Sequence, residues 1–294
     1  MPEHAETAPP PVLPPIAVIG GGNMASAVLL GAIDAGVLDP DRLVVADRNA
    51  EKRDRFRIAV PDAASAVETA ASMEQIPGDA AIMLAMKPQH FAACAAEIAP
   101  VLASVGASRL FISILAGTTS RTIASTLGGG ARVARAMPNT PVRLREGITA
   151  IAPGKTATEH DMAVSRRLFA AVGEVIELDE NRIEAFASVA GSGPAYVFYL
   201  AEAMLRGAAG VGFGPEVAER LVRRTLLGAS RLLDTQRDES PRELRARVTS
   251  KNGMTAAATD VFDKGDVLST VSCGIVAARD RGHELAAETE RPDG

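Results

Sequence analysis

The residues that could do chemistry begin with three consecutive glycines at positions 20–22. An apolar run at 16–19 precedes them and apolar residues at helical spacing follow, so a buried parallel strand, a turn and a helix are expected. In the pattern Gly20-x-Gly22-x-x-Ala25, Gly20 permits the tight turn, Gly22 admits a pyrophosphate and Ala25 keeps the helix close to the strand. N–H groups at the start of the helix suit phosphates. The pattern predicts a dinucleotide site, and a glycine turn without ligand is the alternative.

The next candidate positions are Asp47 and Arg48, after an apolar strand expected over residues 42–46. An acidic residue there hydrogen-bonds the ribose 2′-hydroxyl of NAD, whereas an arginine accommodates the 2′-phosphate of NADP. Both residue types are present, so the choice of cofactor stays open. Alternatively Asn49 caps the following helix and the two charges are solvated.

Two further strand ends carry polar residues. Lys87 follows the expected strand 79–85, and Pro88 suits the start of the next helix. Asn139 lies in the segment 136–141, where two prolines predict a rigid loop that presents its amide. The carboxyl ends of parallel strands hold ligands in such folds. A surface lysine and a plain turn are the alternatives.

A second candidate site opens the helix expected over residues 254–264. Thr249, Ser250 and Gly253 precede this helix and Thr255 begins it, so hydroxyl and N–H groups form an anion site. The alternative is that Ser250 or Asn252 only caps the helix.

The sequence lacks a candidate base for alcohol oxidation. None of its four histidines, and no lysine, falls on the long helix expected over 194–211, which links the two expected domains. A hydroxy-acid dehydrogenase needs such a base. An imine can take its proton from water, so the residues favour reduction of C=N over C=O.

The elements that position these residues divide the chain in two. Strands and helices alternate as far as residue 178, ending with strands at 148–152 and 174–178 that are expected at the sheet edge. Only helices are expected afterwards. We therefore expect an α/β fold, with an N-terminal Rossmann-like dinucleotide-binding domain at 15–178 and an all-helical C-terminal domain at 179–288 for substrate binding and dimerisation. Residues 1–14 are expected to be a disordered, Pro-rich tail. Helices that are apolar nearly all round, at 194–211 and 215–233, predict pairing between subunits.

The composition excludes several classes of protein. The chain has 294 residues, a net charge of −5, 3% aromatic residues and no tryptophan, which argues against a nucleic-acid partner. Two distant cysteines provide neither a disulfide framework nor a zinc site, and we expect no metal. No apolar run approaches the ~20 residues of a membrane span, and the first fifteen residues lack the pattern of a signal peptide. We therefore expect a cytoplasmic protein without a membrane partner.

Five blocks, taken together, resemble one family. They are Gly-Gly-Gly-Asn-Met-Ala (20–25), Leu-Ala-Met-Lys-Pro-Gln (84–89), Ala-Met-Pro-Asn-Thr-Pro (136–141), Gly-Ser-Gly-Pro-Ala-Tyr (191–196) and Val-Thr-Ser-x-x-Gly-x-Thr (248–255). In this order they resemble pyrroline-5-carboxylate reductase, from residue 16 to about residue 285. The resemblance implies reduction of 1-pyrroline-5-carboxylate to L-proline with NADPH, or with NADH, as the last step of proline biosynthesis. It also implies a homodimer, often assembled into a decamer.

The resemblance also assigns residues to roles. Cofactor contacts are implied for Ile19, Gly20, Gly22, Asn23, Met24, Asp47, Arg48, Ala85, Met86, Lys87, Pro88, Ala116 and Asn139. The substrate carboxylate is implied to bind Ser250, Gly253, Met254 and Thr255, with Thr255 and Ser250 as the catalytic pair.

The chain departs from the family pattern at a few positions. The family usually reads Ser-Pro-Gly-Gly-Thr/Ala-Thr where this chain has Ser250-Lys251-Asn252-Gly253-Met254-Thr255. Asn252 tolerates left-handed backbone better than most residues, and Met254 is bulkier than the usual residue. Asp47 is expected to loosen a preference for NADPH. Another imine reductase, a β-hydroxyacid dehydrogenase relative and a nucleotide-sensing regulatory protein stay open as alternatives.

Overall fold

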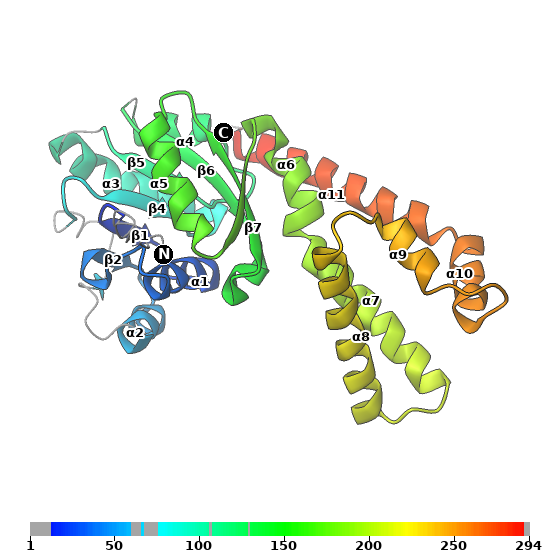
Figure 1. Cartoon of the computed structure of the whole chain (residues 1–294). Helices are drawn as coiled ribbons and strands as arrows, with labels where there is room; N and C mark the ends of the chain where they lie inside the picture. The colour runs from blue at the N-terminus through cyan, green and yellow to red at the C-terminus, as the bar shows by residue number, and fades with distance from the viewer. Residues whose placement is uncertain (1–12, 60–65, 68–75, 106–107, 129, 291–294) are drawn as a thin grey trace, which may run out of the picture. The chain divides into compact units, whose positions relative to one another are not determined.

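The computed structural model describes residues 13–59, 66–67, 76–105, 108–128 and 130–290 (Figure 1). By its internal contacts the chain forms two compact units. Unit 1 comprises residues up to Gly191 together with those from Arg279 onward, and unit 2 comprises Ser192–Ala278. This division falls later than the expected domain boundary after residue 178, and the last helix contributes to both units.

Unit 1 is built on one sheet of eight strands in the order β3-β2-β1-β4-β5-β6-β7-β8. The strands from β3 to β6 are parallel, β7 is antiparallel to β6, and β8 is parallel to β7. Their bounds are β1 Ile16–Ile19, β2 Leu43–Ala46, β3 Ala66–Val67, β4 Ala81–Leu84, β5 Leu110–Ser113, β6 Arg132–Pro138, β7 Gly147–Pro153 and β8 Gly173–Glu177. The chain reverses its direction of winding between β1 and β4, and ligands bind at such a switch point.

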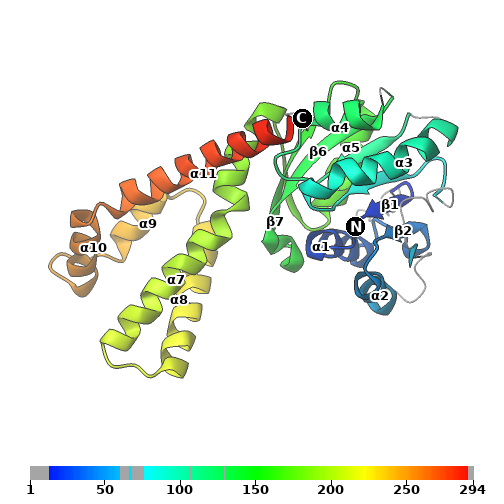
Figure 2. The same cartoon turned by 180° about the vertical axis from the view of Figure 1, so that it is seen from behind.

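Helices cover both faces of this sheet because the buried strands are apolar on both sides (Figures 1 and 2). Along β1, Ile16 and Val18 pack with α1 and α5, whereas Ala17 and Ile19 pack with α3 and α4. The helices of unit 1 are α1 Asn23–Asp34, α2 Ala50–Ala59, α3 Phe91–Val105, α4 Ser120–Leu127, α5 Glu159–Ala170 and α6 Ile183–Phe186. Short 3-10 segments are η1 Pro40–Arg42, η3 Pro88–His90, η4 Thr140–Leu144 and η5 Glu180–Arg182, and a π-helical turn, η6, spans Ala187–Gly191.

Unit 2 contains only helices, as expected. They are α7 Gly193–Gly210, α8 Pro215–Thr235, α9 Pro241–Arg247, α10 Met254–Lys264 and the first part of α11, Val267–Glu290. Many large apolar side chains on them are exposed in the single chain, for example Phe198 at 63% and Phe262 at 54%. No helix in the described ranges is long and apolar enough to cross a membrane.

Three expectations about the elements were wrong. Residues 136–138 continue β6 instead of starting a loop, because Ala136, Met137 and Pro138 pair with β7. For the same reason β7 lies inside the sheet, and only β8 lies at that edge.

The third difference concerns the N-terminal tail, whose residues 1–12 lie outside the described part. Leu13 is fully buried. Its N–H donates to Val37 O at 2.9 Å, and its carbonyl accepts from Arg42 Nη1 at 3.2 Å. Leu13 is therefore packed into unit 1, although the expected tail extended to residue 14.

Candidate functional site

The glycine turn after β1 gives different roles to its first and last glycine. Gly20 has φ +103°, and a Cβ placed on it would lie 2.7 Å from the backbone carbon of Ala85. Only glycine fits there. A Cβ on Gly22 would meet no atom of the described chain within 4 Å. Gly20 is therefore required by the fold, whereas the surface of Gly22 is open to a ligand.

Gly22 is also the N-cap of α1, and it has no side chain to cap the helix. As the N-cap it has φ −70° and makes no side-chain cap hydrogen bond, and the first turn of α1 holds no acidic residue. The first turn of α1 therefore supplies no negative charge of its own to the positive end of this helix. The open glycine and the uncapped helix start fit a dinucleotide pyrophosphate within the expected segment Ile19–Met24. The free N–H groups would come from the helix start at Gly22–Met24, because Gly20 N–H and Gly21 N–H already donate to Ala46 O and Asp47 Oδ2.

Asp47, directly after β2, braces the glycine turn. Its Oδ2 accepts from Gly21 N–H at 2.8 Å and from Lys52 Nζ at 3.2 Å, and its Oδ1 accepts from Asn49 N–H at 2.8 Å. Burial raises the pKa of Asp47, but the hydrogen bonds from Asn49, Gly21 and Lys52 outweigh it and hold the pKa below its ordinary value. The carboxylate is thus ionised, and both its oxygens accept hydrogen bonds within the protein. The sequence predicted a contact with the cofactor ribose but did not predict these internal hydrogen bonds.

Arg48 lies beside Asp47 with its side chain 70% exposed, and it forms an ion pair with Glu97 of α3. A guanidinium held in this way still has unused N–H donors. Arg48 is therefore available to a phosphate at the end of β2, in competition with Glu97.

The ends of β4 and β5 provide the next candidates. Ala85 N–H donates to Ile19 O at 2.9 Å, which brings the segment after β4 against the glycine turn. Lys87 is exposed, and Pro88 begins η3. Ala116 is exposed after β5 and precedes Gly117 at φ +66°. The structure thus brings the cofactor candidates of β1, β4 and β5 to one edge of the sheet, and Met86 lies half-buried among them.

Asn139 differs from the expected exposed amide. It is 7% exposed, and its Oδ1 accepts from Ile148 N–H at 3.0 Å. Its Nδ2 donates to Ala190 O at 3.1 Å. The side chain therefore ties β6, β7 and η6 together, and only one amide N–H is left for a ligand.

The expected substrate residues gather at the start of α10 in unit 2. Gly253 is the N-cap and makes no side-chain cap hydrogen bond, so neither Ser250 nor Asn252 caps the helix. Asn252 has φ +58°, the left-handed backbone that asparagine tolerates. The Ser250 hydroxyl lies so close to Gly253 that it would have to turn away if a Cβ were placed there. The Thr255 side chain is exposed, and Met254 is 93% exposed in the single chain. Ser250 and Thr255 thus flank an uncapped helix start, which suits a carboxylate.

Arg55 of α2 is a site residue that the sequence did not predict, and its Nη1 donates to Asn23 Oδ1 at 2.7 Å. Asn23 is the first residue of α1, so this guanidinium lies at the helix start described above. Arg55, Arg143 and Arg145 also line a groove of about 470 Å³ along α1. The basic run in α2 was a signal of positive charge, but it did not show which side chain reaches Asn23. In the described residues, no three His, Cys, Asp or Glu side chains gather to hold a metal.

Comparison with known proteins agrees with this geometry. Residues 15–117 match the family described as NADP oxidoreductase, coenzyme F420-dependent, and residues 180–285 match pyrroline-5-carboxylate reductase dimerisation. The chain is 36% identical to the pyrroline-5-carboxylate reductase of Pseudomonas aeruginosa, covering 94% of this chain and 98% of that protein. It is 33% identical to the Mycobacterium tuberculosis enzyme of the same name, with the same coverage.

Solved structures show the same likeness. The pyrroline-5-carboxylate reductase of Coxiella burnetii superposes with a TM-score of 0.82 at 33% identity, covering 93% of this chain and 99% of that one. The Plasmodium falciparum pyrroline carboxylate reductase, solved with NADP bound, has a TM-score of 0.80 at 22% identity over 93% of this chain and 98% of that one, and shows the shared fold. Relatives above 30% identity over nearly the whole chain establish the relationship: the chain belongs to the pyrroline-5-carboxylate reductase family.

Proposed function

We propose that this chain reduces 1-pyrroline-5-carboxylate to L-proline with NAD(P)H, the last step of proline biosynthesis. The observation that carries the proposal is the start of α10, where two hydroxyl groups, Ser250 and Thr255, flank a helix without a side-chain cap. Such a site binds a carboxylate. The open turn at Gly22 in unit 1 supports the binding of the dinucleotide cofactor.

In unit 1, the backbone of Ile19–Met24 binds the pyrophosphate and Ala85–Pro88 with Ala116 line the cofactor toward its reacting end. When bound, the nicotinamide supplies the hydride. Asn139 supports this edge mainly by bracing β6 against β7, and its spare amide N–H faces the cofactor. Asp47 holds the glycine turn and lies beside the adenosine ribose.

We propose NADPH as the preferred cofactor. Arg48 is the side chain at the end of β2 that offers positive charge to a 2′-phosphate. Arg55, at the start of α1, serves the pyrophosphate of either nucleotide and does not set this preference. NADH remains a substrate, because the pyrophosphate contacts are common to both nucleotides.

In unit 2, Thr255 and Ser250 hold the carboxylate of the substrate through their hydroxyl groups, together with N–H groups of Gly253 and Met254. These contacts fix the orientation of the imine carbon for hydride transfer. In the described chain the helix α7, Gly193–Gly210, carries no histidine or lysine. We therefore propose water as the source of the proton on the imine nitrogen.

The proposed dinucleotide domain is 15–178 and the proposed substrate-binding and dimerisation domain is 179–288. Exposed apolar side chains on α7, α8 and α11 support a homodimer through the second domain, which a decamer would extend. The enzyme acts in the cytoplasm on a small molecule, without a nucleic-acid or membrane partner.

The decisive experiment follows oxidation of NADPH and of NADH with racemic 1-pyrroline-5-carboxylate, with proline identified as the product. Simple 2- and 3-hydroxy acids with the oxidised cofactors are the controls. Proline formation with NADPH supports the proposal. Turnover of a hydroxy acid without proline formation, or cofactor binding without turnover of any of these, would refute it.

A further inference from the structure

A small polar cavity of about 100 Å³ lies at the amino-terminal edge of the sheet in unit 1. Ala81, Leu110 and Arg132, the first residues of β4, β5 and β6, contribute to its wall. The cofactor candidates lie at the carboxyl ends of the same parallel strands, so this cavity is a separate place in the fold.

Arg109 is the unusual residue of the cavity wall. Its side chain is 5% exposed, and Nη1 donates to Pro77 O at 3.1 Å. The buried Nε has no hydrogen-bond partner, and in the described chain Arg109 forms no ion pair. A buried guanidinium with an unused donor costs stability unless a ligand or water satisfies it.

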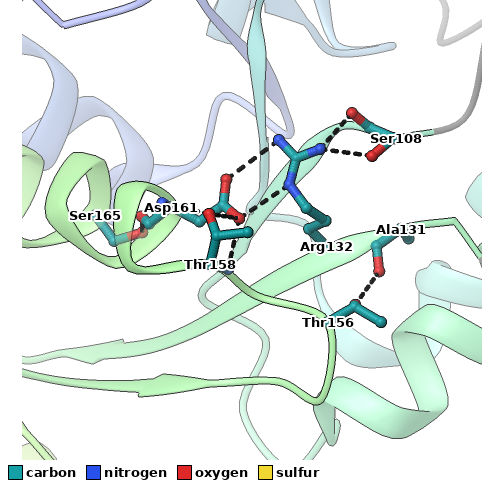
Figure 3. A network of polar contacts seen from close by, with 7 residues as sticks. All are labelled: Ser108, Ala131, Arg132, Thr156, Thr158, Asp161 and Ser165. Atoms are coloured by element: carbon teal, nitrogen blue, oxygen red, sulfur yellow. Dashed lines mark hydrogen bonds and ion pairs between the residues drawn. The ribbon is translucent and has the colours of Figure 1, made fainter.

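A second guanidinium in the wall, Arg132, is held rigidly (Figure 3). Its Nε and Nη2 donate to the two carboxylate oxygens of Asp161 at 2.9 and 3.2 Å. Its Nη1 donates to the carbonyl and hydroxyl oxygens of Ser108 at 2.5 and 2.7 Å. Nη2 carries two hydrogens, and one is left for another acceptor.

The carboxylates of the wall do not neutralise Arg109. Asp161 is paired with Arg132 and closes the capping box of α5 with Thr158. Asp79 Oδ2 lies 3.8 Å from Arg42 Nη2 and forms an ion pair with it. Each of these carboxylates pairs with another arginine, so the positive charge of Arg109 is not compensated by either of them.

We propose that this cavity binds a small inorganic oxyanion of the size of phosphate or sulfate, held by the guanidinium of Arg109 and the spare N–H of Arg132 Nη2. The space of about 100 Å³ for the centres of water molecules is several times the roughly 10–15 Å³ that one water needs on this measure, so a tetrahedral oxyanion fits. The anion compensates the buried charge and stabilises the amino ends of three strands. This site does not depend on the proposed activity.

The test uses the full-length protein saturated with NADPH, so that the cofactor phosphate sites are filled. Inorganic phosphate is titrated at constant ionic strength against chloride, and bound phosphate is measured by equilibrium dialysis while Tm is recorded. We expect about one phosphate bound per chain and a saturable rise in Tm of roughly 2–3 °C at ten times Kd. Sulfate in a second arm shows whether tetrahedral shape and charge suffice.

Variants locate the binding. Arg109→Met should abolish the saturable response. Arg109→Lys keeps the charge but loses the planar fork, and should weaken phosphate binding about tenfold or more. The matched control, Arg166→Met, removes an exposed guanidinium of α5 that pairs with Glu177 and should leave the response unchanged. Lack of phosphate binding by the unaltered protein would overturn the proposal even if Arg109→Met failed to fold, as would an unchanged response in Arg109→Lys and Arg109→Met.

Discussion

Replacement of Gly22 separates ligand binding from folding. In Gly22→Ala the new methyl group meets no atom of the described protein within 4 Å, and the residue keeps an ordinary φ of −70°. Alanine is a poorer N-cap than glycine by roughly 0.5–1 kcal/mol, but it reduces the entropy of the unfolded chain by a similar amount, about 0.4–1 kcal/mol. The free energy of unfolding should therefore stay nearly unchanged.

Cofactor binding should respond differently. If the pyrophosphate binds at this turn as proposed, the methyl group occupies the space through which one of its oxygens reaches the N–H groups of α1. Loss of one hydrogen bond to a charged group costs about 1.5–3 kcal/mol, which raises Kd for NADPH roughly 10- to 150-fold. Gly22→Val should have a larger effect in the same direction. Calorimetric titration with NADPH and a thermal melt of each variant measure the two quantities.

The neighbouring glycines are the controls. A Cβ on Gly21 would make ordinary contacts of 3.4–3.5 Å with Phe56, Lys52 and Val45, so Gly21→Ala should retain both stability and affinity. Gly20→Ala places a Cβ 2.7 Å from a backbone carbon at φ +103° and should prevent normal folding. A folded Gly22→Val protein with unchanged affinity for NADPH would refute the assignment of this turn to the cofactor.

Four other predictions follow from the structure. Thr255→Ala should lower kcat/KM for pyrroline-5-carboxylate about 10- to 100-fold with little change in cofactor affinity. Two controls should retain activity: Thr255→Ser, which keeps the hydroxyl, and Thr259→Ala, which removes a hydroxyl that donates to Thr255 O within α10. Full activity in Thr255→Ala would contradict the proposed carboxylate site. Arg48→Ala should weaken the binding of NADPH more than that of NADH, and equal losses of affinity would exclude a 2′-phosphate contact. Arg55→Ala should weaken the binding of both nucleotides alike, and Arg57→Ala on the same helix α2 is its control. The folded-state pKa of Asp47 lies below its ordinary value of 3.8, so the carboxylate stabilises the fold above that pH and loses this effect as pH falls through the folded-state pKa. Asp47→Asn should therefore lower the free energy of unfolding at neutral pH and make it depend less steeply on pH in acid. Superimposable unfolding curves for the variant and the unaltered protein would contradict a stabilising role of the carboxylate at the glycine turn. Phe198→Asp, at a side chain that is 63% exposed in the single chain, should yield monomers or aggregates in sedimentation, and an unaltered oligomer would place the interface elsewhere.

Local patterns were enough to predict the strand, glycine turn and helix around Gly20–Gly22. A parallel strand buried on both faces reads as an apolar run, and glycine is the residue that permits φ +103°. The start of α10 was predicted for a similar reason, since its boundary depends on residues close in the chain. Apolar helices in the second half likewise indicated surfaces that a single chain leaves exposed.

Contacts between distant segments decided the rest. Residues 136–138 are strand because β7 pairs with them, and the proline pattern alone predicts a loop. Asn139 is buried because Ile148 and Ala190 come to its amide from 9 and 51 residues away. Arg48 meets Glu97, and Arg55 meets Asn23. Each pairing depends on how helices pack on the sheet, so residue type and spacing predict which groups are charged or polar but not which partners satisfy them.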